Sequence, residues 1–164
     1  MTAHAPVLVL GLGNDILTDD AVGLHVARAV RSALADEADV AVEETTEMGL
    51  ALLDAIADRE ALVLVDAVQT GRAPFGHIHE FSSADLSGVL TTSPHFLGVG
   101  ETLALGRSLG LTMPRDVRIL AIEVADPLTL GEELTPAVAA AVKAAAERVV
   151  ELARSFAYAA ASCR

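Results

Sequence analysis

The amino-acid sequence predicts an α/β fold of three layers (αβα), with helices on both faces of a twisted, mostly parallel five-stranded sheet that has one antiparallel edge strand. Two observations predict this architecture. Residues 7–10 and 61–65 are unbroken apolar runs, which is typical of parallel strands buried on both faces. Segments with apolar residues at helical spacing lie between the strand candidates, as in βαβ units. We therefore expect a single domain over residues 1–164, with its core in about residues 7–160.

The first half of the chain alternates strand and helix patterns. The β-prone run at residues 7–10 stops at a glycine-rich loop. From about residue 19 a helix is expected, because apolar residues recur four, three and four positions apart; they are Val22, Val26, Ala29 and Ala33. A second strand is expected at residues 40–44 and a second helix at residues 48–57. Residues 61–66 form the most apolar strand candidate, which should be central in the sheet.

The second half continues this alternation. Residues 71–76 are rich in Gly and Pro and predict a turn, whereas residues 77–81 alternate weakly, as an edge strand does. A helix is expected at residues 94–109 and a buried strand at residues 117–124. Thr135 followed by proline suits an N-cap and the first position of the last helix.

Composition and charge exclude several kinds of partner. The chain has 23 acidic and 11 basic residues, and its formal net charge of -12 repels nucleic-acid phosphates and anionic lipids. We expect no nucleic-acid partner and no membrane partner. The first apolar run lacks a basic leader, and charged residues interrupt the Ala-rich C-terminal segment, so neither a signal peptide nor a membrane span is expected. The single cysteine, Cys163, has no disulfide partner, which favours a reducing, cytoplasmic location.

Three polar residues are candidates for a functional site. Asp20 follows the loop after the first strand, Asp66 ends the most apolar strand, and His95 begins a helix. Ligands bind outside the carboxyl ends of parallel strands in open α/β sheets, so these residues are expected to converge there. Two carboxylates and an imidazole suit a divalent metal such as zinc or nickel, with coordination positions left open.

Each candidate also has a purely structural interpretation. Asp19 and Asp20 at a helix start would complement the helix dipole. A carboxylate such as Asp66 at the end of a buried strand must find a partner or water, and His95 could be an ordinary loop or cap residue. Only the expected convergence of Asp20, Asp66 and His95 favours a shared chemical role.

Other motifs are weaker. Residues 106–110 spell the Gly-x-Ser-x-Gly pattern of a serine nucleophile, which needs a strand-to-helix turn; here the pattern is expected to end a helix, with Gly106 and Gly110 as helix-ending residues. His77 and His79 share one face of a strand, where they could bind metal. The one acidic residue nearby, Glu80, points the other way, so the pair is expected to face solvent instead.

The pair Gly11 and Gly13 suggests a dinucleotide-binding loop. The third glycine of that motif is replaced by Ile16, and the acidic residues Asp19 and Asp20 would repel a pyrophosphate. Dinucleotide binding is therefore kept only as an alternative.

Residues 11–23 resemble the opening signature of the nickel-iron hydrogenase maturation proteases, which is Gly-x-Gly-Asn, then two acidic residues, then glycine. The resemblance continues through four more stretches, namely residues 63–67, 93–98, 122–123 and 134–136. It implies that Asp20, Asp66 and His95 contact a metal and that Asn14 shapes the loop beneath them.

The resemblance implies an endopeptidase that removes the C-terminal extension of a nickel-loaded hydrogenase large-subunit precursor. The nickel then belongs to the substrate, and no tightly held cofactor is expected, although zinc or cadmium could occupy the site in vitro. Either Asp20 or Asp66 could act as the general base. A non-catalytic chaperone that binds the loaded precursor is the alternative within the same pathway.

Two positions depart from the family pattern. Ala21 stands where the signature often has glycine, and residues 43–49 replace an Asp-Gly-Gly-Thr-like turn. The second departure borders the expected cleft, so it bears on which precursor is recognised.

Overall fold

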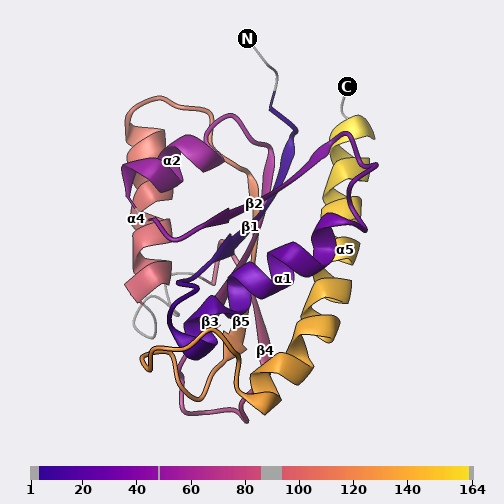
Figure 1. Cartoon of the computed structure of the whole chain (residues 1–164). Helices are drawn as coiled ribbons and strands as arrows, with labels where there is room; N and C mark the ends of the chain where they lie inside the picture. The colour runs from indigo at the N-terminus through magenta and orange to yellow at the C-terminus, as the bar shows by residue number, and fades with distance from the viewer. Residues whose placement is uncertain (1–3, 48, 86–93, 163–164) are drawn as a thin grey trace.

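The computed structural model describes residues 4–47, 49–85 and 94–162, the last range without the side chains of residues 94–97. Within these ranges one sheet has the strand order β2-β1-β3-β5-β4 (Figure 1). The strands are β1 (Val7–Leu12), β2 (Val40–Thr45), β3 (Ala61–Val68), β4 (Ile78–Ser82) and β5 (Asp116–Glu123). The helices are the 3₁₀ turn η1 (Thr18–Ala21), α1 (Val22–Arg31), α2 (Leu50–Ile56), α4 (Pro94–Ser108) and α5 (Pro136–Ser162).

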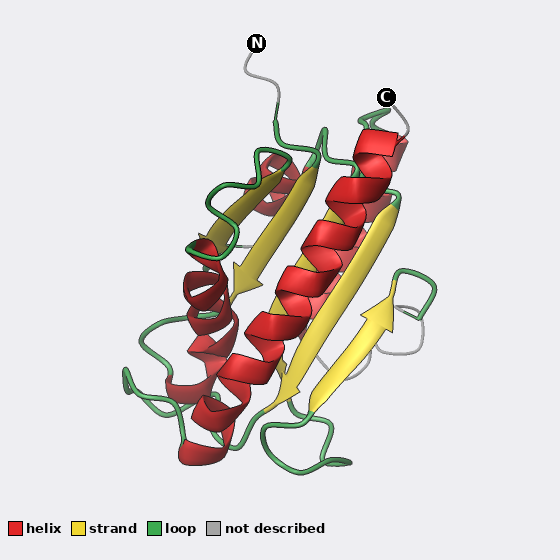
Figure 2. Ribbon diagram, turned by 90° about the vertical axis from the view of Figure 1, so that its right-hand side faces the viewer, coloured by secondary structure: helices red, strands yellow, loops and turns green. Residues whose placement is uncertain are grey.

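The strand directions confirm the expected topology. β1 pairs in parallel with β2 and β3, and β3 pairs in parallel with β5. β4 lies at the edge and pairs antiparallel with β5 (Figure 2). The apolar run predicted to be central is β3, which lies in the middle of the sheet. Residues 61–68 are all buried, which explains why their sequence does not alternate.

Two apolar clusters fill the space between the layers. One lies under α1 and α5 and includes Val63 and Val65 of β3. The other lies under α2 and α4 and includes Leu62 and Leu64 of the same strand. Successive side chains of a strand point to opposite faces, so β3 contributes to both clusters. Figure 1 shows the two helical layers on either side of the sheet.

Some helix ends differ from the sequence prediction. The helix expected from about residue 19 begins as the 3₁₀ turn η1 and becomes α-helical at Val22. Gly110, with φ 75°, ends α4 as predicted. The prediction for Gly106 is wrong, because this residue lies inside α4, where a Cβ atom would come within 2.3 Å of the Met113 sulfur. Glycine is needed there for close packing rather than for termination.

The Gly-x-Ser-x-Gly stretch is not a nucleophile turn. Ser108 is the last residue of α4, and its hydroxyl donates to the Leu105 carbonyl at 2.8 Å. Within the described ranges, no helix is both long and apolar enough to cross a membrane.

Candidate active site

The carboxyl ends of the parallel strands place Asp66 at one edge of the sheet. Asp66 lies in β3, directly after Val65, which is in register with Gly11 of β1. Its side chain is fully buried, and Oδ1 accepts a hydrogen bond from the Ala67 backbone N–H at 2.8 Å. Strand alternation puts Asp66 on the same face as Leu64, which is the face covered by α2 and α4.

Asp20 is brought to the same edge by three close backbone contacts. A Cβ atom on Gly13 would lie 2.1 Å from the Asp20 carbonyl oxygen. A Cβ atom on Gly23 would lie 2.1 Å from the Leu12 carbonyl oxygen and 2.4 Å from that of Val65. Glycine at both positions therefore lets η1 and the start of α1 rest directly on the ends of β1 and β3, beside Asp66.

The Asp20 side chain is half-buried and lines a small pocket. This pocket has a volume of about 190 Å³. Its wall is formed by the loop after β1 on one side and by the end of β2 on the other: Leu12, Gly13, Asn14, Leu17, Asp20, Thr45, Thr46 and Glu47. Asn14 shapes this wall, because its Oδ1 accepts from the Ile16 N–H at 3.2 Å and its carbonyl from the Leu17 N–H at 3.1 Å.

His95 is the second residue of α4. The other end of α4 leads through residues 109–115 to the start of β5, so α4 begins at the carboxyl edge of the sheet (Figure 1). The backbone of His95 therefore lies at the same edge as Asp20 and Asp66. Its side chain lies outside the described part of the structure, so its convergence with the two carboxylates stays a prediction.

Asp19, which sequence analysis treats as a helix-start residue, has a different role. It is fully buried, and its carboxylate accepts four hydrogen bonds. The backbone N–H groups of Ala125, Asp126 and Thr135 donate to it at 3.1, 3.0 and 2.7 Å, and the Thr135 hydroxyl donates at 2.9 Å. Asp19 thus ties η1 to the loop between β5 and α5. Thr135 directly precedes α5, as expected for an N-cap residue, and its hydroxyl donates to Asp19.

A third buried carboxylate, Glu123, ends β5. It accepts hydrogen bonds from the Thr70 N–H and hydroxyl at 2.8 and 2.7 Å and from the Gly71 N–H at 2.9 Å. His79 Nε2 lies 2.9 Å from its Oε2. Burial raises the pKa of Glu123, but the hydrogen bonds from Thr70, His79 and Gly71 outweigh it and hold that pKa below its ordinary value. Glu123 fixes the loop that follows β3.

The prediction that His77 and His79 form a solvent-facing pair is wrong for His79. Only 18% of its side chain is exposed, because the ring turns toward Glu123. The His77 ring meets it edge-on, with the centroids 4.7 Å apart, and residue 77 itself is exposed. Antiparallel pairing with β5 creates this contact, and the sequence of β4 alone does not reveal it.

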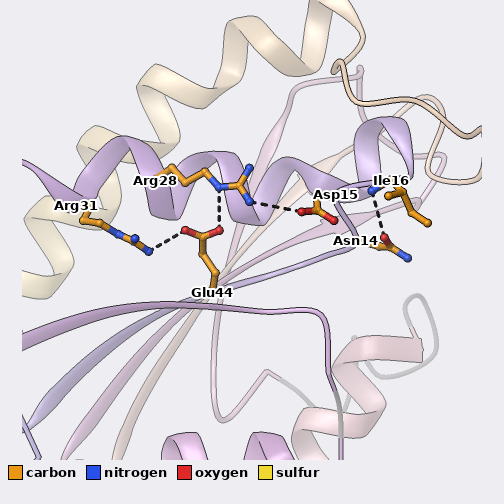
Figure 3. A network of polar contacts seen from close by, with 6 residues as sticks. All are labelled: Asn14, Asp15, Ile16, Arg28, Arg31 and Glu44. Atoms are coloured by element: carbon orange, nitrogen blue, oxygen red, sulfur yellow. Dashed lines mark hydrogen bonds and ion pairs between the residues drawn. The ribbon is translucent and has the colours of Figure 1, made fainter.

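The end of β2 is held by an exposed ionic network. Arg28 and Arg31 of α1 donate to the two carboxylate oxygens of Glu44 at 2.8 and 2.7 Å, and Arg28 lies 3.8 Å from Asp15 (Figure 3). Glu44 directly precedes Thr45, which lines the Asp20 pocket. This network fixes one wall of that pocket to α1.

The metal shell predicted from the sequence lies only partly within the described residues. Among the described residues, no group of three or more His, Cys, Asp or Glu side chains is placed to hold a metal ion. The His95 side chain is outside that set, so the metal shell of Asp20, Asp66 and His95 stays a prediction. Carboxylate and imidazole donors are suited to nickel or zinc.

Comparison with known proteins decides the family. A family model described as hydrogenase maturation protease (HycI) matches residues 24–152. The chain belongs to the hydrogenase maturation protease family. Its activity class is therefore that of a hydrolase acting as an endopeptidase. The matched range contains Asp66 and His95 and begins just after the glycine and acidic signature that carries Asp20.

Relatives of known sequence and structure agree with this assignment. The hydrogenase 2 maturation protease of Escherichia coli K12 is 28% identical over 146 residues, which cover 88% of each chain. The hydrogenase expression/formation protein HupD of Rhodobacter capsulatus is 30% identical over 93% of this chain and 74% of its own length.

Two solved structures of family members share the fold. The maturating endopeptidase HybD of E. coli superimposes with a TM-score of 0.77 at 28% identity, over 92% of this chain and 93% of that one. HybD of Thermococcus kodakarensis gives 0.69 at 28% identity, over 90% and 98%. Family membership favours the protease over the dinucleotide-binding alternative. Packing explains the two glycines of that motif, because a Cβ atom on Gly11 would lie 2.3 Å from the Gly23 carbonyl oxygen and one on Gly13 would lie 2.1 Å from that of Asp20.

Proposed function

We propose that this chain removes the C-terminal extension of a [NiFe] hydrogenase large-subunit precursor after nickel has been inserted, with Asp20, Asp66 and His95 facing the precursor's metal. The observation that supports this proposal is the placement of Asp20 and Asp66 at one sheet edge in a chain of the hydrogenase maturation protease family. The nickel belongs to the substrate, and the chain needs no tightly held cofactor of its own.

The two carboxylates differ in ways that suit different roles. Asp66 is fully buried and already accepts a backbone hydrogen bond, which suits a fixed group that orients the metal-bearing segment. Asp20 is half-buried beside a pocket of about 190 Å³, where a water molecule has room. Asp20 is the better placed to take a proton from the attacking water, which is general-base catalysis.

The surroundings of the pocket suit a cationic guest. Asp20 and Glu47 both line the pocket, and none of the described residues that line it is basic. A metal already held by the precursor would therefore meet a negative potential at this edge. Docking would depend on the loaded metal, so that cleavage follows insertion. The proposed place of action is the cytoplasm, where the absence of a disulfide partner for Cys163 is expected.

The proposal is tested by incubating the purified chain with nickel-loaded and nickel-free precursor and measuring release of the C-terminal peptide by mass spectrometry. Release from the loaded precursor alone is the expected result. Binding of the loaded precursor without cleavage under any metal condition would show a chaperone instead of a protease. Subcellular fractionation tests the location.

A further inference from the structure

Two adjoining loops at the carboxyl edge of the sheet carry three exposed large apolar residues among those that the structure describes. Leu128 and Leu130, in the loop between β5 and α5, are 79% and 74% exposed, and Ile16, in the loop after β1, is 56% exposed. Single exposed apolar residues are ordinary on protein surfaces. These three differ because their two loops are joined to each other. We call Ile16, Leu128 and Leu130 the apolar edge patch.

Backbone hydrogen bonds hold the two loops side by side. The Thr18 N–H donates to the Thr129 carbonyl at 3.1 Å, and the Gly131 N–H donates to the Ile16 carbonyl at 3.0 Å. Between them an antiparallel bridge joins Leu17 to Leu130. The orange loop and the indigo loop lie together at the lower end of Figure 1.

Buried and half-buried carboxylates fix this arrangement. Asp19 accepts hydrogen bonds from Ala125, Asp126 and Thr135, at both ends of the loop that carries the leucines. Asp126 Oδ1 accepts from the N–H groups of Leu128 and Thr129 at 3.2 and 2.9 Å. The apolar side chains are therefore presented on a firmly held support, which lowers the entropy lost on binding a partner.

Leu130 of the apolar edge patch is paired with a residue of the Asp20 pocket wall. Leu17, whose backbone pairs with Leu130, lines that pocket together with Asp20. A partner bound at the patch therefore lies next to the pocket of the proposed catalytic carboxylate.

Acidic residues surround the patch. Residues 12–21 and 125–135 contain no lysine or arginine. Asp19 is buried, and the other acidic residues of these segments are Asp15, Asp20, Asp126, Glu132 and Glu133. Exposed carboxylates around an apolar centre fit a partner surface with an apolar centre and basic rim.

We propose that the apolar edge patch is a docking surface for the hydrogenase large-subunit precursor, and that it receives an apolar segment flanked by lysine or arginine residues. This inference rests on the proposed function, since it takes the substrate of that reaction as its partner. Docking at the patch places the precursor's metal-bearing segment over Asp20.

The test is a double variant, Leu128→Ser with Leu130→Ser, measured for cleavage of nickel-loaded precursor. We expect KM to rise at least about tenfold while kcat stays within about twofold, because the patch lies outside the reacting groups. The matched control is Leu109→Ser with Tyr158→Ser, two residues that are 60% and 79% exposed far from this edge. The control should keep the KM of the original chain. If the double variant does not fold, Ile16→Ser gives a second measurement with a smaller rise in KM.

Two outcomes would overturn the docking surface. One is an unchanged KM in a folded double variant. The other is self-association of the original chain, seen by sedimentation, that the double variant abolishes without any change in precursor binding.

If the original chain cleaves no precursor at all, the proposed function fails, and direct binding of the nickel-loaded precursor to an immobilised chain still tests the patch. Equal binding by the original chain and the double variant overturns the inference, and weaker binding by the variant supports it. Raising the ionic strength should also raise KM, because the rim contacts are exposed charges.

Discussion

Asp19 and Asp20 are neighbours in the same 3₁₀ turn, yet their surroundings are opposite. The Asp19 carboxylate is fully buried and accepts four hydrogen bonds from the loop before α5. The Asp20 side chain is half-buried and lines a pocket at the sheet edge. The comparison shows that Asp19 fixes the position of the turn, whereas the turn places the Asp20 side chain in the pocket. Identical chemistry thus serves stability at one position and, as we propose, catalysis at the next.

The largest expected effect is on catalysis at Asp20. Asp20→Asn keeps the size of the side chain and removes its ability to take a proton, so cleavage of the nickel-loaded precursor should fall about 100-fold or more. The Tm should change by less than about 4 °C. Asp36→Asn, at an exposed position in the segment before β2, is the control and should retain activity. Full activity of Asp20→Asn would remove Asp20 from the mechanism.

The same substitution at Asp19 should affect mainly stability. Asp19→Asn replaces one carboxylate oxygen by an amino group that faces backbone N–H donors, which leaves buried donors without acceptors. We expect the free energy of unfolding to fall by about 3 kcal/mol, measured by urea denaturation. An Asp19→Asn variant as stable as the original chain would show that the buried hydrogen bonds of Asp19 do not stabilise the fold.

Glu123 allows the role of a buried carboxylate to be tested by changing the pH. Like Asp19, it is buried and its carboxylate accepts several hydrogen bonds. Its pKa is held below the ordinary value of 4.5 by hydrogen bonds that outweigh burial. A carboxyl whose pKa is lower in the folded state stabilises the fold above its unfolded pKa, and this stabilisation is lost as the pH falls through the folded pKa. Glu123→Gln should therefore lower stability by about 2 kcal/mol at pH 7.

The difference between Glu123→Gln and the original chain should shrink as the pH is lowered below about 4.5, when urea unfolding is measured at several pH values. Glu132→Gln, at an exposed position, serves as the control without such a pH dependence. A difference that stays constant from pH 7 to pH 3 would argue against an ionised Glu123 as the source of the stabilisation.

The smallest effect is expected in the exposed network at Glu44. The Arg31 side chain is 57% exposed, and such ion pairs contribute little because water and salt screen them. Arg31→Gln should lower the free energy of unfolding by less than about 1 kcal/mol, by the same urea measurement. If Arg31→Gln lowered the free energy of unfolding as much as Asp19→Asn does, the exposed ion pair at Glu44 would contribute as much stability as the buried hydrogen bonds of Asp19.

Much of the fold could be predicted from the sequence because its signals are local. The continuous apolar run of β3 indicates a strand buried on both faces, and Pro136 does begin α5. The candidate acids could be chosen because Asp66 interrupts that apolar run. Strand ends in a parallel sheet share an edge, so the placement of Asp20 and Asp66 followed from topology.

The part that could not be predicted depends on contacts between distant segments. Asp19 finds its donors 106 to 116 positions further along the chain, and a single sequence contains no pattern that separates it from Asp20. His79 turns toward Glu123, 44 positions away. Gly106 has the spacing of a helix end but is required by the approach of the Met113 side chain.

The 27-residue helix α5 spans the molecule from one end of the sheet to the other. It starts beside the loop fixed by Asp19, and its last turns meet the first residues of β3 and β5, where Phe156 and Ala160 border a pocket with Ala61 and Asp116. A fluorophore or surface tether attached near Ser162 therefore sits at the far pole from Asp20. A chain anchored there would leave its carboxyl edge accessible to a large protein partner.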